Sequence, residues 1–270
     1  MLAWNSNVWG KLMGPYGTGE NVPALLQQLI QNYDQEIADE LFEEYLFHQN
    51  TIYTITYAVV PYLVQIACSI KDPEVRHNLF ITCGVIEASR NDNDVEPFPA
   101  DWTALAEQVG ASICEEIYSE YIKAIHEIAL LWEEVFAYAY TLEDSEKRYV
   151  LVADAAYRGA HQVANILMTF VDEYIVVCPM CKQEAYLWPN DRHGCIEAFA
   201  QDPVFEEEQE AHPVIPIDEF LDVEQAMLSE RVAMIDEKEL TRDLPYLAGE
   251  VDCPSCGTKI EIWRALLEHF

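Results

Sequence analysis

Residues 174–188 read YIVVCPMCKQEAYLW, and residues 250–263 read EVDCPSCGTKIEIW. In each stretch β-branched and aromatic residues flank two cysteines that are separated by two residues, which predicts a strand, a tight turn and a return strand. Such a turn places both sulfurs on one side of the chain, and two turns supply the tetrahedral four-sulfur shell that zinc prefers. We therefore expect a structural Zn²⁺ held by Cys178, Cys181, Cys253 and Cys256.

Both turns have the form Cys-Pro-x-Cys, and Gly257 follows the second. They resemble the two knuckles of zinc-ribbon proteins, over residues 178–188 and 250–263. The 71 residues between the two pairs exceed the usual spacing of about 15–20. The entropy cost of closing a loop grows only logarithmically with its length, so the insertion is tolerable. We expect a split zinc-ribbon module over 173–270, with an acidic, solvated insertion at 190–248 and a helix at 223–235.

Two other chemistries compete for these cysteines. Thioredoxin-like redox pairs open a helix after a strand, whereas these pairs lie between two strands. Cys195-Ile196-Glu197 followed by the second pair also resembles the order of zinc and base residues in zinc deaminases. That signature places Pro before the pair, where this chain has Asp252, and it leaves the first pair without a partner. We expect His193 and Cys195 to be loop residues, and a zinc-dependent hydrolase or deaminase is the alternative function.

Upstream of these motifs the apolar residues recur at helical spacing. Residues 21–90 predict four helices with short connections, and therefore two antiparallel helical hairpins. The expected N-terminal caps are Asn21, Asp34, Thr51 and Asp72. Pro61 lies inside the third helix and predicts a kink there. Stacked hairpins of this size indicate an α-solenoid of the HEAT kind, so the fold class is mainly α, with a small β module at the C-terminus.

The composition of residues 90–100 is that of a linker. Helical periodicity returns at 101–141, where the length predicts a break near Ser119. A further helix is expected from Ser145 to Val171, bent at Gly159. Residues 1–172 thus form the predicted helical scaffold. Cys68, Cys83 and Cys114 fall within its apolar patterns and are expected in the core.

The N-terminal part also resembles a known family. The residues that carry this resemblance are Trp4, Trp9, Gly17, Val22-Pro23, His48-Gln49, Thr51, Tyr53 and 58–63 (AVVPYL). They are similar to a bacterial family of HEAT-like repeat proteins that are often found beside toxin genes and are proposed to act as immunity proteins. The resemblance covers residues 4–90. It implies a helical repeat fold and an inhibitory protein–protein interaction.

The segment between the second and third helices has two readings. In the first, Thr51 caps the third helix, and His48 or Gln49 bonds backbone carbonyls at the end of the second. In the second, His48, Gln49 and Tyr53 form a partner-binding edge of the scaffold. The second reading is the functional prediction.

Charge is the most unusual global property of the chain. Its 270 residues contain 48 Asp and Glu against 15 Lys and Arg, which gives a formal net charge of −33. Such a field repels nucleic acid and anionic lipid, and it attracts basic partners. The acids are densest late in the chain, where the run Glu206, Glu207 and Glu208 is a predicted partner-binding segment.

The sequence contains no assembled catalytic group. It lacks a phosphate-binding loop and a Gly-x-Ser-x-Gly elbow. It has no apolar run of about 18 residues and no signal-peptide pattern, which predicts a cytoplasmic protein. We expect a non-enzymatic scaffold that binds a protein partner and no nucleic acid or membrane, and its sharpest form is an immunity protein against a bacterial toxin.

Overall fold

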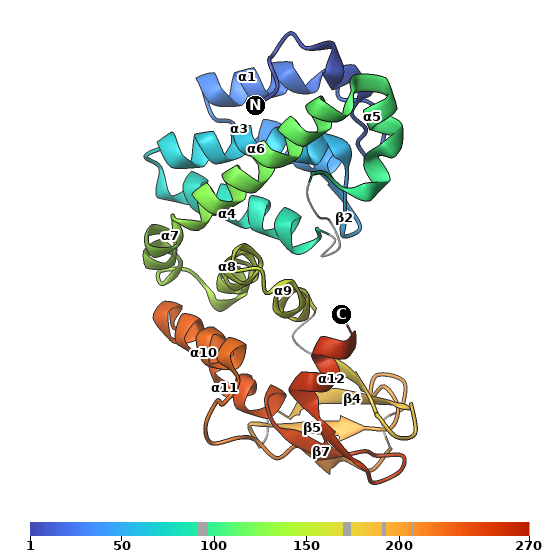
Figure 1. Cartoon of the computed structure of the whole chain (residues 1–270). Coiled ribbons are helices and arrows are strands. Elements are labelled where there is room, and N and C mark those ends of the chain that lie inside the picture. Colours follow the sequence, from blue (N-terminus) through green and yellow to red (C-terminus); the bar gives the residue numbers. More distant parts are fainter. Residues whose placement is uncertain (91–96, 170–173, 191–192, 207, 270) are drawn as a thin grey trace. The chain divides into compact units, whose positions relative to one another are not determined.

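The structure is a computed structural model that describes the chain except for residues 91–96, 170–173, 191–192, 207 and 270. The described part is mainly helical with a small β region toward the C-terminus (Figure 1), which confirms the predicted fold class. The solenoid arrangement stays a prediction. The chain divides into two compact units, residues 1–138 with 156–161, and residues 139–155 with 162–270. The second unit thus takes in residues 139–155 and 162–172 in addition to the expected zinc module at 173–270.

The first unit is built almost entirely of helices. Its α-helices are α1 (Val22–Gln31), α2 (Gln35–Leu41), α3 (Thr54–Ser69), α4 (Pro73–Ala88), α5 (Thr103–Val109), α6 (Ala111–Ala129) and α7 (Trp132–Ala139), the last residue of which falls in the second unit. Its other elements are the 3-10 helices η1 (Asn7–Lys11) and η3 (Ala100–Trp102), the π-helix η2 (Phe42–Leu46) and the strands β1 (Phe47–His48) and β2 (Thr51–Ile52).

Helix α3 is the centre of the first unit. Most of its side chains are buried, and it packs against both α4 and α6. Tyr57 on α3 contacts the rings of Trp102 and Tyr121, with ring centroids 4.9 and 4.7 Å apart. The helix runs on through Pro61. Since aromatic pairs contribute beyond the area they bury, this cluster ties η3 and α6 to the central helix.

The predicted helix starts were partly right. Asp34 and Asp72 accept hydrogen bonds from the first backbone amides of α2 and α4, as expected of capping carboxylates. Asn21 occupies the capping position of α1, but its side chain makes no capping hydrogen bond. The prediction for Thr51 was wrong, because the third helix begins at Thr54.

Thr51 instead belongs to a β-hairpin. Strands β1 and β2 pair antiparallel, with His48 opposite Thr51, and Gln49 and Asn50 form the turn. Their φ values are +49° and +55°, as a two-residue type I′ turn requires. The capping reading of this segment is therefore wrong for Thr51, and His48–Gln49 lies in a hairpin rather than at a helix end.

Glycines lie at two of the breaks between the later helices. The predicted break at Ser119 was wrong, because Ser119 lies inside α6, and the chain breaks at Gly110 with φ +93°. Gly159 has φ +78° and separates α8 (Asp144–Tyr157) from α9 (His161–Met168) instead of bending one helix. Glycine adopts such positive φ without the steric cost that other residues carry. Ser145 lies inside the first turn of α8 rather than before it.

The remaining core predictions concern three cysteines. Cys83 and Cys114 are buried as expected, whereas Cys68 is exposed. The expected linker at 90–100 falls largely on residues 91–96, which lie outside the described part of the chain. None of the helices in the described ranges is both long and apolar enough to cross a membrane.

The second unit contains the larger sheet and a second two-stranded pair. Strands β3 (Tyr174–Val177), β4 (Glu184–Asn190), β5 (Cys195–Phe199) and β6 (His212–Pro213) form a four-stranded antiparallel sheet in chain order. Strands β7 (Glu250–Asp252) and β8 (Lys259–Glu261) form a separate antiparallel pair. Ile215 bridges to Glu250 on β7. Both expected hairpins around the cysteine pairs are therefore present.

The insertion between the hairpins is folded. Helix α10 (Val223–Ile235) has the predicted bounds, but β5, β6 and α11 (Lys238–Leu247) were not expected. In β5, the alternate residues Ile196 and Ala198 are buried, as expected for a strand with one face on the core. The pattern covers too few residues to be recognised in the sequence. The predicted return strand to Trp263 was wrong beyond Glu261, because Ile262–His269 forms helix α12.

Candidate metal centre

The first cysteine pair lies in the turn between β3 and β4. The Cys178 backbone N–H donates to the Gln183 carbonyl at 2.9 Å, and the Lys182 N–H donates to the Cys178 carbonyl at 3.0 Å. Lys182 takes a left-handed conformation with φ +60°. These bonds wrap the backbone around the sulfurs of Cys178 and Cys181.

The second pair repeats this arrangement bond for bond between β7 and β8. The Cys253 N–H donates to the Thr258 carbonyl, and the Gly257 N–H donates to the Cys253 carbonyl, both at 2.8 Å. The left-handed position is taken here by Gly257, with φ +72°. Two segments far apart in the sequence thus form equivalent knuckles.

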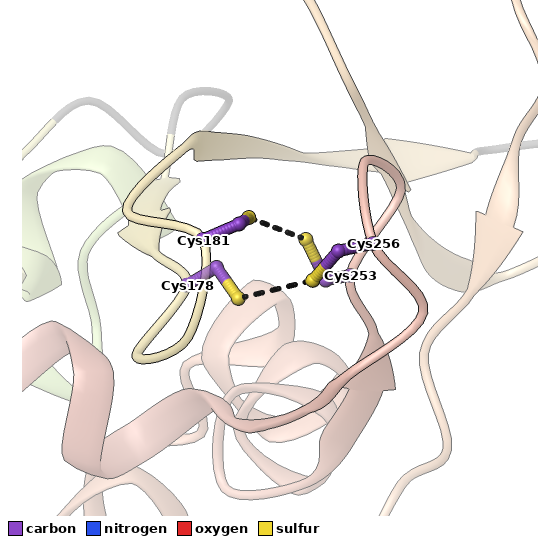
Figure 2. A group of neighbouring side chains, drawn as sticks. All are labelled: Cys178, Cys181, Cys253 and Cys256. Atoms are coloured by element: carbon purple, nitrogen blue, oxygen red, sulfur yellow. Dashed lines mark hydrogen bonds between the residues drawn. The ribbon is translucent and has the colours of Figure 1, made fainter.

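The two knuckles bring all four thiols together (Figure 2). Cys178 Sγ lies 3.7 Å from Cys256 Sγ, and Cys181 Sγ lies 3.7 Å from Cys253 Sγ. All four sulfurs lie within 4.8 Å of one another. A tetrahedron with Zn–S bonds of about 2.3 Å has S–S edges of about 3.8 Å, so these two separations match a zinc shell. A disulfide has an S–S length of about 2.0 Å, and all four cysteines are free thiols.

The centre is anchored on its inner side by the core of the second unit. Cys178 and Cys253 are 0% and 1% exposed, whereas Cys181 is half-buried and Cys256 is exposed. The core around the two buried cysteines includes Tyr174, Val176, Leu187, Val251, Ile260 and Leu266. This core links both hairpins to α12, so the four-cysteine cluster is part of the packing around them.

Local hydrogen bonds favour a thiolate at one sulfur of each knuckle. The Thr258 hydroxyl, 3.4 Å from Cys256 Sγ, and the Thr258 amide lower the pKa of Cys256 to about 6. Burial raises the pKa of Cys178, but the backbone amides of Cys181 and Met180 outweigh it and lower that pKa below its usual value. One sulfur of each knuckle is therefore disposed to ionise, which suits a cation. The role of Thr258 was not predicted, because the sequence indicates it only by its position two residues after Cys256.

The residues of the alternative deaminase arrangement lie elsewhere. Cys195 begins β5 and is not in the predicted loop, whereas His193 lies in the turn before it. The Glu197 carboxylate accepts a hydrogen bond from the Asn190 side-chain amide at 2.9 Å. Among the described residues, the one group of three or more potential metal ligands consists of the four cysteines.

The predicted partner-binding residues fall on two surfaces. In the first unit, His48 Nδ1 lies 3.0 Å from the Tyr16 hydroxyl, Gln49 is exposed and Tyr53 is half-buried. In the second unit, Glu206 and Glu208 are exposed, and Glu207 lies outside the described residues.

Comparison with known proteins gives no relative for this chain. No protein-family model matches it. No curated protein and no solved structure shows significant similarity to it. The resemblances to zinc ribbons and to HEAT-like immunity proteins therefore stay predictions.

Proposed function

We propose that this chain is a non-enzymatic scaffold that binds a basic protein partner, and that a structural zinc ion stabilises its C-terminal region. In its most specific form, the partner is a bacterial toxin and the chain is its inhibitor. The zinc part is supported by the matched knuckles and the 3.7 Å sulfur separations. The proposed binding of a basic partner is supported by the acidic charge of the chain.

The acidic excess lies on the surface as well as in the composition. Between Lys11 and Lys71 the chain has no Lys or Arg, yet it has seven acids. These acids are Glu20, Asp34, Glu36, Asp39, Glu40, Glu43 and Glu44. All seven are exposed, and five of them follow one another along α2 and η2. An uncompensated surface of this kind speeds the encounter with a positively charged protein.

The proposed role of zinc is structural because four cysteines complete its coordination shell. A catalytic zinc ion keeps an open position for water or substrate. The four thiols leave none, and Glu197, the base of the alternative arrangement, is not among them. This donor set therefore favours a scaffold over a zinc-dependent hydrolase or deaminase.

Affinity capture tests the proposed partner. The immobilised chain is expected to retain a basic protein from host cells, and the association rate should fall at least about tenfold between low and physiological salt, because screening removes electrostatic steering. Stopped-flow or surface-based kinetics measures this rate. Replacing Glu36, Glu40, Glu43 and Glu44 by Gln tests whether the α2 surface contributes, and it should slow association with little change in dissociation.

A different result would contradict this proposal. If capture recovers no basic protein, and a metal-dependent turnover of a small molecule appears that Glu197→Gln abolishes, the chain is an enzyme. Capture of a partner whose association is independent of salt would also contradict an electrostatic interaction.

A further inference from the structure

A groove lies directly beside the first cysteine knuckle. Its volume is about 460 Å³, and its lining includes Lys182, Gln183, Glu184, Tyr186, Asp202 and Phe205. The groove thus runs between the start of β4 and the loop that follows β5. Because both walls belong to the second unit, the groove is defined within that unit.

One wall of the groove depends on the metal centre. Residues 182–184 follow Cys181 directly, and the knuckle hydrogen bonds between Cys178, Lys182 and Gln183 hold them in place. A metal ion on Cys178 and Cys181 would fix the backbone that carries Glu184 and Tyr186. The shape of the groove is therefore linked to metal binding.

The other wall is a turn that holds an aromatic ring in solvent. Phe205 is 87% exposed. Its backbone N–H donates to the Asp202 carbonyl at 3.1 Å, and the Val204 N–H donates to Asp202 Oδ1 at 2.8 Å. The Gln209 side chain closes this loop by donating to the carbonyls of Gln201 and Glu206, each at 2.9 Å. A hydrogen-bonded turn thus presents Phe205 to solvent in the lining of the groove.

The charges around the groove define the partner. Glu184 and Asp202 line it, and the exposed Glu206, Glu208 and Glu210 follow Phe205. Lys182 is the one base in its lining. The Tyr186 hydroxyl donates to Glu184 at 2.8 Å, which orients that carboxylate. Carboxylates next to aromatic rings suit the guanidinium group of arginine, which accepts bidentate carboxylate pairing and stacks on aromatic faces, better than the compact ammonium of lysine.

We propose that this groove is the docking surface for an arginine-bearing segment of a basic protein partner, with Phe205 and Tyr186 contacting the guanidinium group and Glu184 pairing with its charge. This inference rests on the proposed binding of a basic partner, and it adds the site and the side chain that is recognised. Zinc then acts on binding by holding the Lys182–Glu184 wall.

Two peptides of equal charge, nona-arginine and nona-lysine, test the groove by calorimetry at physiological salt. Nona-arginine should bind the zinc-loaded chain more tightly than nona-lysine. Phe205→Ala should weaken nona-arginine binding by roughly 2- to 30-fold, as loss of a cation–π contact predicts. Leu221→Ala is the matched control, because Leu221 is also an 87% exposed apolar residue of the same unit and does not line the groove.

Equal binding by Phe205→Ala and Leu221→Ala would overturn the assignment of this groove. In that case salt-dependent binding of both peptides would leave the proposed function intact. Failure of both peptides to bind at low salt would count against the proposed function as well as the groove. Glu184→Gln is a second variant, and it should reduce the preference for arginine over lysine. Thermal denaturation should show that all three exposed substitutions leave the fold unchanged.

Discussion

Replacing Cys253 by serine is expected to unfold the metal-binding region of the second unit while the helices of the first unit stay folded. Cys253 is 1% exposed and packs in the core that joins both hairpins to α12. Binding of structural zinc contributes about 10–16 kcal/mol in small zinc domains, and three thiols hold the ion much less well than four. Limited proteolysis should cut the variant within residues 190–248, and circular dichroism should retain most of the helical signal.

Cys195→Ser is the matched control for this experiment. Cys195 is a half-buried thiol in the same unit, but it is not part of the four-sulfur cluster. Its substitution should leave both metal content and protease resistance close to those of the parent. Loss of the entire helical signal in Cys253→Ser would show that the two units unfold as one, contrary to this expectation.

Replacing Glu87 by alanine is expected to destabilise the first unit by about 3–5 kcal/mol, because removing one member of a buried ion pair leaves the other charge uncompensated in the protein interior. Glu87 is 3% exposed. It accepts hydrogen bonds from Arg90 at 2.9–3.1 Å and from the Tyr121 hydroxyl at 2.6 Å, and its Oε1 lies 3.2 Å from His161 Nε2. Denaturant unfolding followed by circular dichroism measures the loss.

The same cluster predicts a dependence of stability on pH. Burial alone would raise the pKa of Glu87, but hydrogen bonds from His161, Arg90 and Tyr121 outweigh it and hold the folded pKa below the ordinary value of 4.5. A carboxylate with a lowered folded pKa stabilises the fold above its unfolded pKa, and that stabilisation is lost as pH falls through the folded pKa. The free energy of unfolding should therefore decrease below about pH 4.5 in the parent.

In Glu87→Gln the free energy of unfolding should decrease less steeply at acid pH than in the parent, because glutamine does not titrate. Glu115→Gln provides the control, since Glu115 is an exposed residue of α6 in the same unit. An equally steep decrease of the free energy of unfolding at acid pH in Glu87→Gln and Glu115→Gln would contradict the assigned role of the cluster.

The four-cysteine cluster and the main helices could be predicted from the sequence because their signals are local. When two cysteines are separated by two residues, few backbone conformations place both sulfurs on the same side of the chain. The knuckles can therefore be predicted from the spacing alone. Asp34 and Asp72 act as caps through amides only two and three residues away. Such short-range geometry is independent of the rest of the fold.

Other features depend on tertiary context or on weak local signals. The turn at Gln49-Asn50 has positive φ at both residues without a glycine to indicate it. Gly110 ends α5 with a φ of +93°, but apolar periodicity continues across it and so does not indicate a break there. Glu87 joins Tyr121 and His161 only through the packing of α4 and α6 and the chain near residue 161, so its role has no sequence motif.

The most direct test of the central claim is the metal content of the protein as purified without added metal. Elemental analysis of the parent chain and of Cys253→Ser and Cys195→Ser, together with titration of accessible thiols, measures it. We predict about one zinc per chain in the parent and in Cys195→Ser, and much less in Cys253→Ser, with four additional reactive thiols in the parent after chelation. A parent chain that contains no zinc and in which Cys178, Cys181, Cys253 and Cys256 react freely as thiols would contradict the account.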